Sequence, residues 1–438
     1  MREMKDSGMP WIGKIPKNWG TSPIKYICKP NSIKIGPFGS ALANKTFANE
    51  KYNVYGQANL VSGNFSATKN TVTKKTFNDL RNYEVLPDDI CVSMMGTIGK
   101  CRIVPLGIKQ GIMDSHLIKL RVKNEVILPE FFLYVYDKDL GGVCFKQMQY
   151  EKTGSIMDGL NTSIVKRLYV TLPPIKEQHR ITDYLNSKCA KIDSVRKNVE
   201  SEIEALKQYK KSVITEAVTK GLNKNVEMKD SGIPWCPRIP KHWVPTNPKA
   251  LFHQRKERAR ENDKQLTASQ KHGIVFQDDF MKIENQKVVT VAKDFDILKH
   301  VEPNDFVISM RSFQGGLEFS ELSGCISSAY VMLVPNCNLV YPPFYRWLFK
   351  SDKYINAIQS TTNLIRDGQA MRFANFVMVP LFIIPLDEQQ RIADYLNKKC
   401  SKIDSIIQKK QELLANLDTY KKSLIYEYVT GKKEVPAV

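Results

Sequence analysis

Adjacent carboxylates are the side chains of this sequence that most resemble a catalytic centre. Asp88 and Asp89 follow a proline, and Asp278 and Asp279 form a second pair. Such pairs can hold the Mg²⁺ ions of metal-dependent nucleases. Adjacent acidic residues more often belong to turns, so we expect turn chemistry at both places. The six histidines are dispersed without metal-site spacing, which leaves a hidden nuclease only as an alternative.

Motifs for nucleotide or methyl-donor chemistry are missing from the sequence. The stretch GTIGK at 96–100 lacks the spacing and the hydroxyl of a phosphate-binding loop, and no G-x-G-x-x-G opens a helix. The stretch YPPF at 341–344 lacks the Asn or Asp with which amino-methyltransferases hold a target amine. We therefore expect a non-catalytic chain that holds no cofactor and no metal of its own.

The remaining chemical signal is typical of DNA binding. Lys, Arg, Gln and Asn alternate with aromatic residues in two segments, and these types read base edges: Arg contacts guanine, and Asn or Gln contacts adenine. The run Arg255–Arg260 could instead be an exposed helix face. The predicted DNA-binding residues are Gln57, Asn59, Lys74, Lys75, Lys100 and Arg102, and then Arg255, Lys256, Arg258, Arg260, Lys271, Arg311 and Gln314.

Composition favours a nucleic-acid partner in the cytoplasm. The 438 residues carry 65 Lys+Arg against 45 Asp+Glu, a net charge of +20, and an excess of this size favours a polyanion. No run approaches the ~20 apolar residues of a membrane span, and the first eleven residues lack the apolar core of a signal peptide. The nine cysteines include no C-x-x-C pair, which predicts reduced thiols and neither disulfides nor zinc.

Two segments that occur twice show that the chain consists of two copies of one plan. The first, which we call the tryptophan motif, spans 4–19 and 228–243, with eleven of sixteen positions identical at an offset of 224 residues. The second spans 177–194 and 388–405, with fourteen of eighteen identical at an offset of 211. The variable segment between the motifs is therefore 13 residues longer in the first copy.

The second repeat begins a long helix in each copy. Apolar residues recur at heptad-like spacing over about 45 residues, with no Gly or Pro before Gly221 and Gly431. One apolar stripe on each helix predicts an intramolecular, antiparallel coiled coil, with pairing between two chains as the alternative. Cys189 and Cys400 lie on this stripe, where a small buried residue fits. The predicted packing residues are Leu185, Ile192, Val199, Ile203, Leu206, Val213, Leu396, Ile403, Ile407, Leu414, Leu417 and Leu424.

The variable segments predict mixed α/β domains with short strands. Residues 84–96 and 300–312 are weakly similar, as are 111–120 and 324–333, and each pair has turn residues next to β-branched residues. Residues 131–140 and 344–359 have amphipathic helical patterns. The predicted fold class is α+β: two mixed α/β domains at 1–172 and 223–384, separated by helical regions at 173–222 and 385–438. The order of segments predicts a pseudo-twofold repeat whose two termini lie close together.

The chain resembles the specificity subunit of a type I restriction–modification system. The resemblance rests on the paired D-S-G-x-P-W…I-P-x-x-W motifs, on the helix starts L-P-P-x-x-E-Q and I-P-L-D-E-Q, and on two long helices between unlike domains. It covers essentially the whole chain. It implies two target recognition domains that each bind one half of a bipartite site in double-stranded DNA, and helices that set their spacing.

The resemblance also implies partners. Two methyltransferase subunits would dock on the helices, and two restriction subunits would complete the complex. S-adenosyl-methionine, ATP and Mg²⁺ would belong to those partners. Beside the hidden nuclease, two alternatives remain: a specificity module of a fused nuclease–methyltransferase, and a non-specific basic scaffold that binds nucleic acid, including RNA.

Overall fold

The structure is a computed structural model of the chain, and its contacts divide it into two compact units. Unit 1 comprises Met1–Val199 and Gln411–Val438, and unit 2 comprises Glu200–Lys410. The structure describes residues 2–42, 51–66, 68–150, 160–285, 297–309, 312–361 and 371–436. Each unit contains one variable domain and parts of both long helices.

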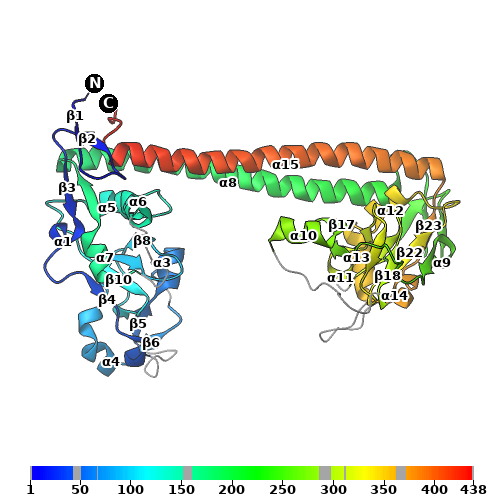
Figure 1. Cartoon of the computed structure of the whole chain (residues 1–438), viewed down its shortest axis with the longest axis horizontal. Coiled ribbons are helices and arrows are strands. Elements are labelled where there is room, and N and C mark those ends of the chain that lie inside the picture. Colours follow the sequence, from blue (N-terminus) through cyan, green and yellow to red (C-terminus); the bar gives the residue numbers. More distant parts are fainter. Residues whose placement is uncertain are drawn as a thin grey trace. The chain divides into compact units, whose positions relative to one another are not determined.

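Unit 1 begins with the first tryptophan motif and continues into a domain of short strands and helices (Figure 1). Its strands are β1 (Met4–Asp6), β2 (Lys14–Pro16), β3 (Gly20–Pro23), β4 (Lys34–Ile35), β5 (Tyr52–Tyr55), β6 (Thr71–Val72), β7 (Ile90–Ser93), β8 (Cys101–Ile103), β9 (Gly111–Met113), β10 (Leu117–Leu120) and β11 (Tyr169–Leu172). Its helices are α1 (Ile24–Ile27), α2 (Gly39–Leu42), α3 (Gln57–Ser62), α4 (Lys74–Asp79), the 3-10 helix η1 (Arg81–Tyr83), α5 (Pro129–Tyr136), α6 (Val143–Tyr150) and α7 (Thr162–Arg167), followed by the long helix α8 (Ile175–Lys220).

Unit 2 follows the same plan after α8. Its strands are β12 (Met228–Asp230), β13 (Arg238–Pro240), β14 (Val244–Thr246), β15 (Phe252–Arg255), β16 (Leu266–Ser269), β17 (Gly273–Phe276), β18 (Lys299–Val301), β19 (Phe306–Ile308), β20 (Glu318–Phe319), β21 (Gly324–Ile326), β22 (Val331–Pro335) and β23 (Leu381–Ile383). Its helices are α9 (Pro248–Leu251), α10 (Gln277–Glu284), α11 (Ser312–Gly315), α12 (Pro342–Leu348), α13 (Asp352–Ser360) and α14 (Phe373–Val377), followed by the long helix α15 (Leu386–Val429).

Both variable domains are built on a four-stranded antiparallel sheet with the same connectivity. The strand order is β4-β10-β7-β8 in unit 1 and β15-β22-β19-β20 in unit 2. The weakly similar segments of the sequence form the central strands, β7 and β10 in one sheet and β19 and β22 in the other. Asp88 and Asn304 both have a positive φ in the turn before the strand, so these segments are turns followed by strands, as predicted.

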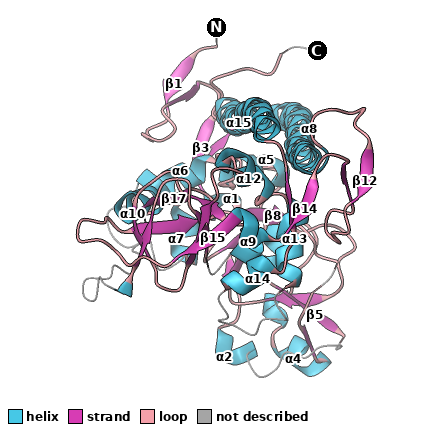
Figure 2. Cartoon of the chain, turned by 90° about the vertical axis from the view of Figure 1, so that its right-hand side faces the viewer, coloured by secondary structure: helices cyan, strands magenta, loops and turns pink. Residues whose placement is uncertain are grey.

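The two long helices are antiparallel, as expected from the sequence. In unit 1, Lys421 Nζ lies 2.7 Å from Asp193 Oδ1; in unit 2, the repeat-equivalent Lys210 Nζ lies 2.7 Å from Asp404 Oδ2. The end view places α8 and α15 next to each other (Figure 2). Among the predicted packing residues, Leu206, Ile407, Leu414 and Leu417 are half-buried, and the other eight are buried. These facts confirm the predicted fold class.

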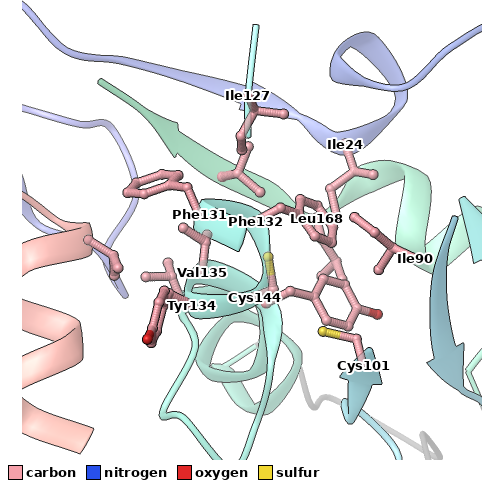
Figure 3. Packing of buried hydrophobic residues seen from close by; sticks show 14 of the residues in the cluster. Ile24, Ile90, Cys101, Ile127, Phe131, Phe132, Tyr134, Val135, Cys144 and Leu168 are labelled. Carbon is pink, nitrogen blue, oxygen red and sulfur yellow. The ribbon is translucent and has the colours of Figure 1, made fainter. Parts of the chain in front are cut away.

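The core of unit 1 joins the helix pair to the variable domain. Phe131, Phe132 and Val135 of α5 are buried against Ile24 and Leu168 (Figure 3), and the same cluster includes Leu185 of α8 and Leu424 of α15. Unit 2 has a corresponding cluster that includes Phe344 and Tyr345 of α12 with Ile392 and Leu396 of α15. Each variable domain is therefore packed directly on the helices of its own unit.

The structure also corrects three local predictions. Residues 344–359 form two helices, α12 and α13, because the chain turns between Phe349 and Ser351. Residues 255–260 are not a helix face: Arg255 ends β15, and the following residues form a loop with one isolated bridge. Asp278 and Asp279 lie in the first turn of α10, where acidic side chains interact favourably with the helix dipole, and not in a loop.

The cysteines of the structure are all free thiols, and only Cys337 is exposed. Burial raises the pKa of Cys189 and of Cys400, which keeps both thiols protonated in the helix seam. Among the described helices, none combines the length and apolarity that crossing a membrane requires. The termini meet within unit 1, where Lys432 Nζ donates to Ile12 O over 2.6 Å, as the order of segments predicted.

Candidate nucleic-acid interface

In unit 1, the first residues of α8 hold the tryptophan motif. Trp19 is buried, and its indole Nε1 donates to Glu177 Oε2 over 2.9 Å. Arg2 donates to the same carboxylate at 2.7 Å, and this hydrogen bond raises the pKa of Arg2. A buried indole N–H needs an acceptor, and Glu177 supplies a charged one. The tryptophan motif is thus attached to the first turn of α8 by these hydrogen bonds and has a structural role there.

Unit 2 repeats this attachment of the tryptophan motif to the helix start with the equivalent residues. Trp243 is buried, and its Nε1 donates to Glu388 Oε2 over 3.1 Å. His242 Nε2 lies 2.7 Å from the same oxygen, in the place of the arginine contact of unit 1. Both tryptophan motifs recur in the sequence because each must reach the glutamate that opens its helix.

The next residue of each helix fixes the variable domain. Gln178 is fully buried; its Oε1 accepts from Leu128 N over 2.8 Å, and its Nε2 donates to Val126 O and Pro173 O. Leu128 is the N-cap residue of α5, and its N–H would otherwise be unsatisfied. The glutamine therefore locks the start of α5 against the start of α8.

Gln389 makes the same three contacts in unit 2. Its Oε1 accepts from Tyr341 N over 2.8 Å, and its Nε2 donates to Leu339 O and Ile384 O. Tyr341 is the N-cap residue of α12. The Glu-Gln pair at each helix start thus orients one variable domain on one end of the helix pair.

A hollow of about 680 Å³ with several polar side chains in its lining lies on the variable domain of unit 1. Its lining includes Gln57 and Asn59 of α3 and the turn between β9 and β10, which carries Asp114 and His116. His116 Nδ1 is 3.4 Å from Asp114 Oδ2, and half of the His116 side chain is exposed. The other polar lining residues are Ser62, Asn64, Thr68, Lys69, Asn70 and Ser115. Amide, hydroxyl and cationic groups of these types bind base edges and phosphates.

Only some of the residues predicted to bind DNA in unit 1 are free to do so. Asn59 is buried, and it accepts from Gly56 N and donates to Asn64 O, so both ends of its amide already have partners within the domain. Gln57 is half-buried and donates to Met95 O and Thr97 Oγ1. Lys100 is paired with Asp139 at 3.0 Å. The side chains of Lys74, Lys75 and Arg102 are exposed.

In unit 2, several predicted cations belong to an ion-pair network. Arg255 binds both oxygens of buried Asp305, at 2.7 and 3.0 Å, and this contact raises the pKa of Arg255. Arg260 pairs with Glu257 and Glu302. The contacts with Asp305 and Glu257 occupy the three guanidinium nitrogens of Arg255, so this side chain holds the fold together locally, and its DNA contact stays a prediction.

Buried His300 extends the network. Its Nδ1 lies 2.7 Å from Asp263 Oδ2, and its Nε2 lies 2.8 Å from Glu302 Oε1. The hydrogen bond from His300 lowers the pKa of Glu302. This cluster was not predicted from the sequence, because its members come from two segments, 255–263 and 300–305, that only the fold brings together.

The other predicted cations of unit 2 face solvent in part. Lys256 is exposed; Arg258 donates to Ile297 O over 2.8 Å; Lys271 is exposed and pairs with Glu284 at 2.8 Å. Arg311 and the side chain of Gln314 lie outside the described residues. Exposed pairs of this kind contribute little to stability, so they can exchange a carboxylate for a phosphate.

Sequence reasoning missed the turn residues Asp114, Ser115 and His116. These residues lie within 111–120, a segment that is similar to 324–333 in the second copy. The two segments differ in the residues between their similar strands, and this difference could have pointed to the turn. Within the described parts of the chain, no three His, Cys, Asp or Glu side chains are grouped as metal ligands.

Comparison with known proteins shows what the chain is similar to. Residues 16–205 match the family model described as the type I restriction modification DNA specificity domain. A putative type I restriction enzyme MjaX specificity subunit of Methanocaldococcus jannaschii is 23% identical, over 97% of this chain and 96% of its own length. The chain therefore contains a type I restriction modification DNA specificity domain and is similar over nearly its whole length to a type I specificity subunit. The type I restriction enzyme EcoBI specificity subunit of Escherichia coli is 20% identical, over 83% of this chain and 77% of its own.

Solved structures share the fold of this chain. The HsdS subunit from Thermoanaerobacter tengcongensis aligns with a TM-score of 0.52 at 14% identity, over 96% of this chain and 98% of its own. A chain from a study of complex assembly and conformational transition of the type I R-M system aligns with a TM-score of 0.69 at 14% identity, over 96% of this chain and 99% of its own. The duplicated plan predicted from the sequence is therefore the plan of the type I specificity subunits.

Proposed function

We propose that the chain is the DNA-reading subunit of a type I restriction–modification complex, in which each variable domain binds one half of a bipartite site. The observation that carries this proposal is the contrast within the duplicated fold. The Glu-Gln helix starts and the four-stranded sheets are equivalent in the two units, but the turns at equivalent places differ. A shared scaffold that carries different side chains in its turns fits two domains that each bind a different DNA sequence.

The differing turns connect equivalent strands. In unit 1 the turn from β9 to β10 carries Asp114, Ser115 and His116; in unit 2 the turn from β21 to β22 carries residues 327–330, Ser-Ser-Ala-Tyr. Hydrogen-bonding groups at these places would distinguish bases, and the surrounding lysines would contact phosphates. The excess of 20 positive charges supports the phosphate contacts.

The proposed partners follow from the family. We propose that two methyltransferase subunits dock on the helix pair and that two restriction subunits complete the nuclease. S-adenosyl-methionine, ATP and Mg²⁺ would bind those subunits, and this chain would be non-catalytic. The helices would set the distance between the half-sites, because a rigid helix pair holds a fixed separation and a flexible linker does not. Within each unit, interhelical ion pairs and the buried seam support such stiffness.

The test is to co-express the chain with its methyltransferase subunit and to map methylated adenines across the genome of the host cell. A bipartite motif with a fixed gap is expected. Replacing residues 20–172 with the same segment of another specificity subunit should change one half of the motif and leave the other half and the gap unaltered. A continuous motif, or changes in both halves, would contradict two independent readers.

Two further assays address the alternatives. Purified chain with Mg²⁺ and duplex DNA should leave the DNA intact; cleavage would mean that the chain is itself a nuclease. Competition between the methylated motif sequence and a scrambled duplex should favour the motif. Equal affinity for both, or for RNA, would instead support a non-specific basic scaffold.

A further inference from the structure

A second hollow, of about 830 Å³, lies in unit 2 beside the end of α8. Its walls include Tyr209 and Ala217 of α8, Tyr395 of α15 and Leu222 of the segment that follows α8. Tyr209, Leu222 and Tyr395 are each 40% exposed or more. Two aromatic rings and one leucine side chain are therefore accessible around a single hollow, which offers apolar surface to a partner.

The repeat explains why the hollow exists. The offset of 211 residues aligns Tyr395 with Tyr184 and aligns Ala217 with Tyr428. In unit 1 the rings of Tyr184 and Tyr428 pack with centroids 4.7 Å apart, and Tyr428 is buried. Unit 2 has alanine in place of the second ring, so Tyr395 lacks the aromatic neighbour that its counterpart has. An aromatic side chain from another molecule would restore the pair.

Unit 1 also shows how a chain segment covers this face of the helix pair. After α15 the C-terminal segment folds back: Lys433 N donates to Glu427 O over 3.1 Å, and Arg180 donates to Val435 O over 3.1 Å. The equivalent residues of unit 2 are Glu216 and Arg391. Glu216 lines the hollow, and within the described residues Arg391 forms its ion pair with Asp387, one turn away on the exposed face of α15.

The charges at the rim define the segment that would fit. Lys220, Lys224 and Arg238 line the hollow and are exposed, against the single carboxylate of Glu216. A net positive rim around aromatic walls favours a segment with an aromatic residue next to carboxylates.

We infer that this hollow of unit 2 is a docking point for an aromatic side chain in an acidic segment of the methyltransferase subunit. The inference rests on the proposed function for the identity of the partner. Unit 1 fills the equivalent place with its own Tyr428, so the two ends of the duplicated chain offer unequal docking surfaces. The methyltransferase copy that meets unit 2 gains an anchor that the other copy lacks.

The decisive experiment measures binding of purified methyltransferase subunit to the full chain by calorimetry. Tyr395→Ala removes the exposed ring and should weaken the tighter binding step about tenfold or more, as expected for an aromatic anchor. Ile406→Ala is the matched control, because Ile406 is on the same helix in the same unit, is 45% exposed and does not line the hollow. The control should bind as the unaltered chain does.

A second variant fills the hollow with an aromatic ring of the chain itself. Ala217→Tyr supplies the ring that unit 1 has, and it should weaken methyltransferase binding while Tyr395 is intact. If this variant fails to fold, which its melting curve shows, Tyr395→Ala still decides the question, because that side chain is substantially exposed.

The outcomes separate the inference from the function on which it rests. Failure of the unaltered chain to bind the methyltransferase overturns the proposed function. Normal binding by the unaltered chain with equal affinity in Tyr395→Ala overturns only the docking point. Equal losses in Tyr395→Ala and Ile406→Ala, or loss of DNA affinity in place of methyltransferase affinity, also overturn it.

Discussion

The buried glutamine at the start of each long helix should govern the stability of one variable domain and not the other. Gln178→Met keeps a side chain of similar length but removes all three hydrogen bonds to Leu128 N, Val126 O and Pro173 O. Each buried group left without a partner costs about 1–3 kcal/mol. The orphaned N–H and two carbonyl oxygens together should cost about 3 kcal/mol, since each carbonyl can relax toward the lower end of that range.

A loss of about 3 kcal/mol raises the population of open states roughly 100-fold. A single unfolding midpoint would not resolve the two units, because a chain of this size need not unfold in one step. Hydrogen exchange measured by mass spectrometry does resolve them. In Gln178→Met, the amides of α5 from Phe132 to Tyr136 should exchange up to roughly 100-fold faster, while those of α12 keep their rate.

The reciprocal variant is the control. Gln389→Met removes the bonds to Tyr341 N, Leu339 O and Ile384 O, so it should accelerate exchange in α12 and leave α5 unaffected. An exposed glutamine, Gln208→Met, should accelerate neither helix. Unaltered exchange in α5, or equal acceleration of α5 and α12 by both variants, would refute the assignment of one clamp to one domain.

Three further predictions test the rest of the framework. Ile403→Glu places a charge in the helix seam at a residue that is 4% exposed, so it should lower the free energy of urea unfolding by about 3 kcal/mol or more. Leu414→Glu should lower it less, because Leu414 is half-buried. Equal and negligible losses in the two variants would argue against a buried seam. Trp243→Phe removes the indole donor to Glu388 and should lower the free energy of unfolding by about 1.5–3 kcal/mol, whereas Trp347→Phe, whose bond to Asn397 is exposed, should cost less. The pKa of Glu302 is lowered from its ordinary value of 4.5, chiefly by the hydrogen bond from His300. Its contribution to stability is therefore present above pH 4.5 and is lost as the pH falls through the lowered pKa. Glu302→Gln should show a flatter fall of the urea midpoint as the pH is lowered below 4.5, and an unaltered slope would contradict this role.

The sequence by itself determined the duplicated plan. Two pairs of repeats at fixed offsets, an uninterrupted heptad pattern and two unlike segments are properties of residue order, and they predicted the helices, their antiparallel pairing and the contact between the termini. Periodic burial and capping act over a few residues, so a sequence displays them directly. Even the turns before β7 and β19 followed from local residue chemistry.

Tertiary structure decided what the individual side chains do. Asn59 and Arg255 have the residue types of DNA readers, but one caps α3 and the other is bound to Asp305, 50 residues away. The Glu-Gln pair was visible as a repeat, yet its partners Trp19 and Leu128 lie 158 and 50 residues distant. The hollow beside Tyr395 depends on an alanine in another helix. Such roles depend on which distant groups the fold brings within hydrogen-bonding or packing distance, and spacing along the chain does not encode that.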